Sequence, residues 1–160
     1  DFNGVICTEV IEHVKDPAGA IAEVARVCKT GGLLYITAPM SWALHYEPYD
    51  YFRFTRYGLQ SLLEDSGFRV VETRQIGGVF AMTWGRLSDT LVSLLYRVAF
   101  PLKYLIGSHR RVIVVSVLTL PFIVAVDLVA AVLDAIVPGA RKDALGWAMI
   151  AERVAAPADS

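Results

Sequence analysis

The sequence predicts a mixed α/β domain built around a parallel sheet. An apolar, β-favouring run covers residues 2–10, an amphipathic helical segment follows Asp16, and a second apolar run covers residues 33–38. A strand, a helix and a strand joined by short connections form a βαβ unit, whose two strands lie parallel with a right-handed crossover. The opening run is continuous rather than alternating, which is typical of a strand covered on both faces.

The helices are predicted from their start and stop signals. Asp16 is a good N-cap, Pro17 suits the first helical position, and Gly31 stands where a left-handed residue would end the first helix. After an aromatic loop, Thr55 is expected to cap a second helix that ends at Gly67. An alternating run at residues 69–76 then predicts an outer strand.

Beyond residue 78 the composition becomes rich in Leu, Val and Ala. We expect three or four helices here, broken at Pro101, Gly107, Pro121 and Pro138, before a last strand begins near residue 144. The predicted organisation is a domain at 1–78, a helical insertion at 79–143, the final strand of the first domain at 144–156, and a tail at 157–160.

Composition excludes several classes of protein. The 160 residues are 55% hydrophobic and 19% charged, which excludes disorder, and the formal net charge of −1 gives no reason to expect nucleic acid as a partner. Cys7 and Cys28 show no CxxC spacing and no cluster with histidine. Reduced thiols and a cytoplasmic location are therefore expected.

Several motifs occur in a specific order: "ICTEVIEHVKDP" after the first strand, "RVCKTGG" at the end of the helix, "YFRFT" before the next helix, "GFRVVE" after it, and a late "LGWAMIAERV". This ordered set resembles the C-terminal half of small-molecule class I S-adenosylmethionine-dependent methyltransferases, in particular the ubiquinone-biosynthesis O-methyltransferases. The resemblance covers roughly residues 1–78 and 144–154.

The resemblance implies a Rossmann-like, doubly wound sheet of seven strands whose last strand is antiparallel. The chain would supply strands four to seven at residues 5–10, 33–38, 69–76 and 146–154, with the hydrophobic helical insertion before the last strand. The family's glycine-rich cofactor loop follows its first strand, and this sequence contains no such loop. We therefore expect a fragment that is inactive alone.

The segment "TEVIEHV" is the first candidate site. The resemblance implies that residues leaving this strand, Cys7, Thr8 and Glu9, contact S-adenosylmethionine. If residues 9–13 form a helical turn, Glu9, Glu12 and His13 share one face and could ligate a divalent ion, Mg²⁺ or Zn²⁺. Alternatively His13, with Glu12 beside it, acts as a general base, or both residues only shape the loop.

The segment "HYEPYDYFRFT" is the second candidate site. Aromatic area combined with a few polar groups suits the wall of a ligand pocket, and the resemblance places this loop over the acceptor. We expect substrate contacts from His45, Tyr49, Asp50 and Arg53. The alternative is that Asp50 and Arg53 only pair with each other.

Residues 112–137 form a hydrophobic stretch that carries Pro121, Asp127 and Asp134. Its length permits a membrane span, but two carboxylates in a bilayer are costly, and a span would separate strands that belong to one sheet. A soluble helical cap and peripheral membrane contact through residues 112–137 both remain open.

The predicted function is S-adenosylmethionine-dependent methyl transfer to a small-molecule acceptor, with oxygen as the favoured atom and a lipid-like acceptor among the candidates. Such a transfer needs mainly an aligned, deprotonated nucleophile, so positioning carries much of the rate. The alternatives are a non-catalytic methyltransferase-like binding domain and a membrane-surface protein.

Overall fold

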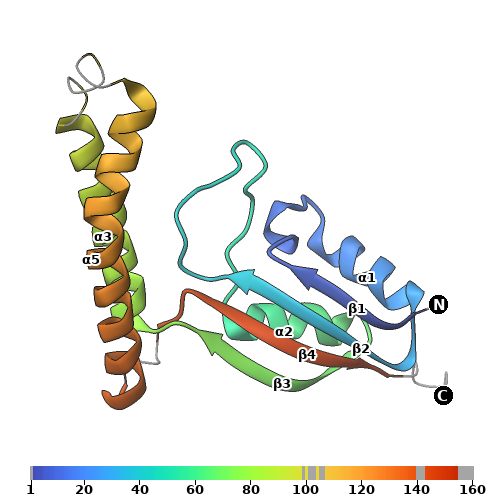
Figure 1. The fold of residues 1–160 in the computed structure, drawn as a ribbon. Helices are drawn as coiled ribbons and strands as arrows, with labels where there is room; N and C mark the ends of the chain where they lie inside the picture. Colours follow the sequence, from blue (N-terminus) through green and yellow to red (C-terminus); the bar gives the residue numbers. More distant parts are fainter. Residues whose placement is uncertain (1, 99, 101–103, 105–106, 140–142, 155–160) are drawn as a thin grey trace, which may run out of the picture. The chain divides into compact units, whose positions relative to one another are not determined.

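The computed structural model describes residues 2–98, 100, 104, 107–139 and 143–154 (Figure 1). The chain divides into two compact units, one formed by residues 1–76 with 144–160 and the other by residues 77–143. The predicted tail at 157–160 lies outside the described residues.

In its described residues, unit 1 is a four-stranded sheet with two α-helices and one short 3-10 helix, and its mixed α/β class is as predicted. Its elements are β1 (Phe2–Thr8), η1 (Ile11–His13), α1 (Pro17–Val27), β2 (Cys28–Pro39), α2 (Arg56–Asp65), β3 (Phe68–Ile76) and β4 (Gly146–Arg153). The strand order is β1-β2-β4-β3. β1 and β2 are parallel, and β4 is antiparallel to both β2 and β3, which confirms the direction predicted for the last strand.

The core of unit 1 lies on one face of this sheet. Ile21 of α1 and Leu63 of α2 are both fully buried against sheet residues such as Leu34, Ile36 and Met149. Both helices therefore cover the same face. On the opposite face Ile6, Leu33 and Tyr35 remain exposed, so within the described residues β1 is not covered on both faces, although its continuous apolar run predicted that it would be.

The caps predicted from the sequence are present. The Asp16 side chain accepts from the Gly19 N–H at 3.0 Å, and the Thr55 hydroxyl accepts from the Gly58 N–H at 3.1 Å. The predicted C-cap at Gly31 is wrong, because α1 ends at Val27 and the chain is already extended at Cys28. Gly31 does have a positive φ of 78°, but it lies within β2 where the register with β1 is irregular. Its left-handed backbone therefore belongs to this irregularity of the strand and not to a helix end.

Unit 2 contains two long helices, α3 (Val79–Val98) and α5 (Ser108–Ile136), which pack against each other. The predicted break at Pro121 is wrong, because α5 continues through this residue. A proline removes one backbone hydrogen bond, and the helix continues on both sides of the exposed Pro121. The expected break at Pro101 lies outside the described residues.

Candidate functional site

The loop after β1 is held to the end of β2. Glu9 has a positive φ of 50°, unusual for a residue with a side chain, and its N–H contacts both the backbone oxygen and the Oγ1 of Thr37 at 3.2 Å. The chain then forms the short helix η1, whose Ile11 is buried in the core. This anchoring turns the next residue, Glu12, inward at the carboxyl edge of the parallel strands, where α/β proteins bind their ligands.

Glu12 is fully buried, and neither carboxylate oxygen has a hydrogen-bond partner in the part of the chain that the structure describes. Its backbone oxygen accepts from the N–H groups of Tyr51 and Phe52 at 2.9 and 3.2 Å, which joins η1 to the aromatic loop. Burial raises the pKa of the Glu12 carboxyl above its ordinary value. A buried carboxyl without partners costs free energy of folding, so it marks a candidate site.

Two histidines direct the same ring atom toward this carboxyl. Nε2 of His13 lies 3.6 Å from Glu12 Oε1, and Nε2 of His45 lies 4.0 Å from it. On the other side of each ring, Nδ1 of His13 is 2.6 Å from the Tyr49 carbonyl, and Nδ1 of His45 is 3.1 Å from the Ala43 carbonyl. A carbonyl only accepts, so each Nδ1 carries a proton, and Nε2 is the ring atom that offers a lone pair in the neutral tautomer.

This cluster of Glu12, His13 and His45 can perform two kinds of chemistry. A free Nε2 beside a carboxylate can take a proton from a substrate, and the carboxylate then stabilises the imidazolium. A ring fixed through Nδ1 by a backbone carbonyl is also the usual arrangement of metal-binding histidines. The three ligand atoms lie within 4.8 Å of one another. Bonds of about 2.1 Å allow at most roughly 4.2 Å between two ligands, so an ion would require the widest pair to close.

Glu9 is not part of the cluster, so its predicted place among the metal ligands is wrong. The prediction assumed one helical turn over residues 9–13, whereas the helix begins at Ile11 and Glu9 is exposed with a left-handed backbone. His45, which was expected to bind substrate, occupies the third position instead. The sequence signal was a second histidine in the loop after the next strand, since parallel strands end at one edge.

Asp50 and Arg53 pair with each other, which is the alternative given above to their contacting substrate. Two guanidinium nitrogens of Arg53 donate to the two carboxylate oxygens of Asp50 at 2.6 and 2.7 Å. Arg53 also donates to the carbonyls of Trp42, Ala43 and Phe52. The Arg53 guanidinium holds the pKa of Asp50 well below its usual range. With so many internal partners, this pair holds the loop in shape.

The Asp50 carboxylate also positions the cluster, because its Oδ2 accepts from the His45 N–H at 2.9 Å. Tyr49 contributes its carbonyl to His13, while its side chain is exposed. The ring of Tyr46 lies 5.6 Å from the His13 ring, and its backbone has a positive φ of 54°. The aromatic loop therefore forms one wall around the two imidazoles, with Tyr46 and Tyr49 available at the surface.

The predicted cofactor contacts follow β1 but face different ways. Cys7 pairs in register with the buried Ile36, so its side chain packs toward the helix-covered face, and burial raises its thiol pKa. Thr8 and Glu9 are exposed. Glu9 lines a shallow cavity of about 160 Å³ at this sheet edge, together with residues that sequence reasoning did not single out: Pro39, Trp42, Ile76, Leu145 and Gly146. Side-chain contact with a ligand is therefore open to Thr8 and Glu9, but not to Cys7.

A family model described as a methyltransferase domain matches residues 1–73, just under half of the chain. This segment contains the whole of the Glu12, His13 and His45 cluster. No curated protein matches the chain.

Solved structures also match the chain, at low identity. The cyclase SpnF is 17% identical with a TM-score of 0.49, and the match covers 97% of this chain and 50% of SpnF. A protein assigned as a methyltransferase from Bacillus halodurans C-125 is 14% identical with a TM-score of 0.48, over 96% and 65% of the two chains. Phosphoethanolamine N-methyltransferase 2 of Haemonchus contortus, solved with S-adenosyl-L-methionine, is 16% identical with a TM-score of 0.46, over 97% and 34%. The chain thus spans only a third to two thirds of these proteins.

Proposed function

We propose that unit 1 is the acceptor-binding part of an S-adenosylmethionine-dependent methyltransferase that methylates an oxygen of a small-molecule acceptor. One observation carries the proposal: a buried carboxyl that has no hydrogen-bond partner among the described residues faces two imidazole Nε2 atoms, within a segment that matches a methyltransferase domain. The match supports methyl transfer, and the proton-accepting groups favour a hydroxyl as the acceptor.

The bound cofactor would supply an electrophilic methyl group, and Thr8 and Glu9 are the residues placed to hold it. A hydroxyl acceptor must lose its proton as it attacks, and His13 Nε2 is the group that takes it. Nδ1 of His13 stays bonded to the Tyr49 carbonyl throughout, so the ring keeps its orientation. The Glu12 carboxylate then stabilises the resulting positive charge at 3.6 Å.

The same three side chains support a second form of the proposal, in which they hold a divalent ion that orients the acceptor oxygens. Two imidazole nitrogens and one carboxylate oxygen are a donor set suited to Zn²⁺ or a similar transition metal, whereas Mg²⁺ prefers oxygen ligands. The orphaned carboxylate of Glu12 fits an ion as well as it fits an imidazolium.

The test uses the complete gene product that contains this chain. Transfer of a labelled methyl group to a panel of aromatic and aliphatic hydroxyl compounds is measured, together with cofactor affinity by calorimetry. His13→Ala should lower kcat by about 10²–10⁴-fold, the usual contribution of a general base, while cofactor affinity changes little. Glu23→Ala, which removes an exposed carboxylate on α1, is the matched control and should leave kcat unchanged.

The result also separates the two forms of the proposal. Treatment with a chelator leaves the rate unchanged if His13 acts as a base, and abolishes it if the cluster holds an ion. A wild-type protein that fails to bind S-adenosylmethionine would overturn the proposal and favour a non-catalytic binding domain. If the His13→Ala variant has the same kcat as wild type, the cluster has only a structural role.

A further inference from the structure

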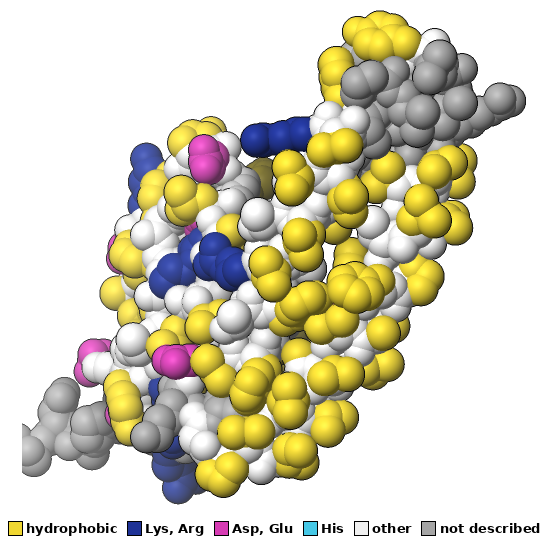
Figure 2. Space-filling model, turned by 90° about the vertical axis from the view of Figure 1, so that its left-hand side faces the viewer, with side chains coloured by type: hydrophobic (Ala, Val, Ile, Leu, Met, Phe, Trp, Pro, Cys, Tyr) yellow, Lys and Arg dark blue, Asp and Glu magenta, His cyan; other side chains and the backbone are white. Residues whose placement is uncertain are grey.

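Helix α5 exposes more apolar surface than a soluble helix needs. Within Val112–Ile136, an 18-residue stretch reaches a mean hydropathy of 2.7, and only 6% of that shorter stretch is buried. Its large exposed side chains include Val117, Leu118, Val124, Leu128 and Val132. Figure 2 shows hydrophobic side chains gathered along the helical hairpin on the face in view. Contiguous apolar surface of this extent marks a binding surface or a membrane contact.

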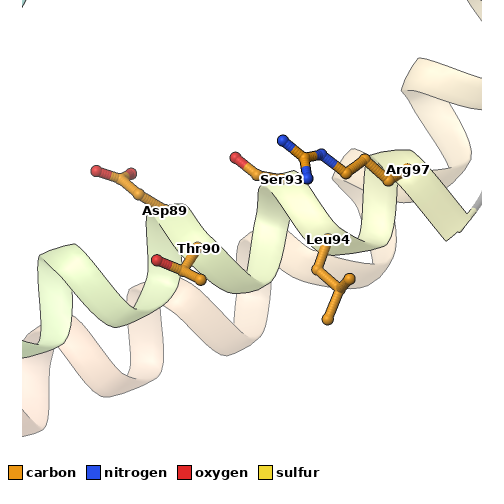
Figure 3. Close-up of a pocket in the computed structure, with 5 residues that line it drawn as sticks. All are labelled: Asp89, Thr90, Ser93, Leu94 and Arg97. Atoms are coloured by element: carbon orange, nitrogen blue, oxygen red, sulfur yellow. The ribbon is translucent and has the colours of Figure 1, made fainter.

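The hairpin of α3 and α5 has two unlike outer faces. On α3 a polar stripe recurs at helical spacing and lines a shallow cavity: Asp89, Thr90, Ser93 and Arg97. Figure 3 shows Asp89, Ser93 and Arg97 on the same side of the helix. The stripe lies about half a turn from the buried Ser88, so it faces away from α5.

On α5 the buried residues are Val115, Ala130 and Asp134. By helical spacing, the residues opposite them are Val117, Pro121, Val124, Leu128 and Val132, which are all exposed and uncharged. The outside of α3 thus carries charged and polar side chains beside exposed apolar ones such as Leu94, whereas these five residues of α5 carry no charge.

The two carboxylates of the hydrophobic stretch do not contradict an apolar environment. Asp134 is buried and accepts from the backbone N–H groups of Phe80 and Ala81 at 2.9 and 3.1 Å, so it caps the start of α3. Asp127 lies next to the α3-facing side rather than on the outer face of α5. The face formed by Val117 and Leu128 is thus free of charge.

Chain topology decides how the hairpin can meet a bilayer. α3 follows β3 and α5 precedes β4, and these two strands pair in one sheet, so both ends of the hairpin must stay on the same side of a membrane. Standing upright would carry Asp89 and Arg97 of α3 into the acyl region, where charge is costly. Lying in the plane of the interface leaves them in water and still buries the outer face of α5.

We propose that the α3–α5 hairpin lies flat in the interface of a lipid bilayer, with α5 among the acyl chains and the polar stripe of α3 toward water. A lipid surface fits better than a second copy of the chain, because specific protein interfaces carry a polar rim around their apolar core. Over the described side chains of Val112–Ile136, about 37 Å of helix, the outer face of α5 has no such rim. The proposal does not rest on the methyltransferase activity.

Flotation with vesicles tests it directly on the 160-residue chain. Vesicles of phosphatidylcholine alone, and of phosphatidylcholine mixed with phosphatidylglycerol, should both carry the protein to the top of a density gradient. The double variant Val117→Glu/Leu128→Glu should weaken binding to the neutral vesicles by about tenfold or more, because two charges would enter the apolar layer. The control Thr90→Glu/Ser93→Glu makes the same change of charge on the polar stripe and should bind like wild type.

Orientation is tested with an environment-sensitive fluorophore on single cysteines, in a chain whose Cys7 and Cys28 are replaced by alanine. Labels at positions 117 and 128 should report the same apolar depth, and a label at position 90 should report water. A graded depth between 117 and 128 would overturn the flat orientation. Equal loss of binding in both double variants would overturn the role of the α5 face. A stable dimer in solution that Val117→Glu/Leu128→Glu dissociates, without vesicle binding by wild type, would assign the face to a second copy.

Discussion

The two units of this chain differ in how far their apolar side chains are buried. In unit 1 the residues that pack between helices and sheet, such as Leu34 and Leu63, are completely buried, and the buried carboxyl of Glu12 has no hydrogen-bond partner among the described residues. In unit 2 most large apolar side chains of α5 are exposed, and the buried carboxylate of Asp134 is satisfied by two N–H groups. Unit 1 thus has a closed apolar core beside the candidate site. Unit 2 instead leaves the apolar surface of α5 uncovered.

The comparison is sharpest for two leucines. Leu63 of α2 is fully buried, while the side chain of Leu128 on α5 is 63% exposed. Leu63→Ala should lower the free energy of unfolding of unit 1 by about 2–5 kcal/mol, because it removes transfer energy and leaves a cavity. Leu128→Ala should change the stability of unit 2 by no more than about 0.5 kcal/mol in water. Hydrogen exchange followed by mass spectrometry measures each unit separately.

A large loss of stability for Leu128→Ala in the absence of lipid would contradict this contrast, since it would mean that the α5 surface is packed in the protein itself. The same variant should also weaken vesicle binding, and less than Leu128→Glu, because alanine shortens the apolar contact without adding a charge.

The second contrast concerns the two aspartates of α5. Asp134→Ala should destabilise the hairpin by about 1 kcal/mol, within the 0.5–2 kcal/mol range measured for helix caps, because the N–H groups of Phe80 and Ala81 lose their acceptor. Asp127→Ala changes an exposed residue and should have an effect below about 0.5 kcal/mol. Urea unfolding followed by circular dichroism measures both. Equal effects would show that Asp134 acts only through its charge.

Local signals in the sequence predicted the secondary structure of unit 1 well. Asp16 and Thr55 were recognised as caps because an N-cap depends only on the residues that follow it. Gly31 was misassigned because a positive φ suits a strand irregularity as well as a helix end. Pro121 was misassigned because a proline can cost a long helix one hydrogen bond without ending it.

The candidate site was less predictable, because it depends on contacts between segments far apart in sequence. Glu12 and His13 could be singled out from their position after a strand, but the approach of His45 depends on the path of the loop between Pro39 and Thr55. That path is set by the Asp50–Arg53 pair and by the bonds of Arg53 to three carbonyls, none of which follows from residue types alone. The choice of Glu9 failed for the same reason, since its left-handed backbone arises from its bonds to Thr37.

The third contrast compares the pH dependence of stability due to the buried Glu12 carboxyl with that due to an exposed carboxyl. Burial raises the folded-state pKa of Glu12 above its ordinary value of 4.5, so at lower pH the carboxyl is protonated in both the folded and the unfolded chain. As the pH rises through 4.5, the unfolded chain releases this proton first, and wild-type stability falls until the pH passes the folded-state pKa. Glutamine has no proton to release, so Glu12→Gln should become progressively more stable than wild type as the pH rises, and then level off.

Urea unfolding of both proteins across this pH range, with a chelator present, measures the difference directly. Glu23→Gln is the control, because Glu23 is exposed and pairs with Arg26 on the surface of α1, and its difference from wild type should stay small. If instead wild type gains stability relative to Glu12→Gln as the pH rises, the Glu12 anion is stabilised in the folded state. The Glu12 carboxylate would then be satisfied within the folded chain. The unsatisfied buried carboxyl on which the proposed function rests would be lost, and the proposal would fail in both of its forms.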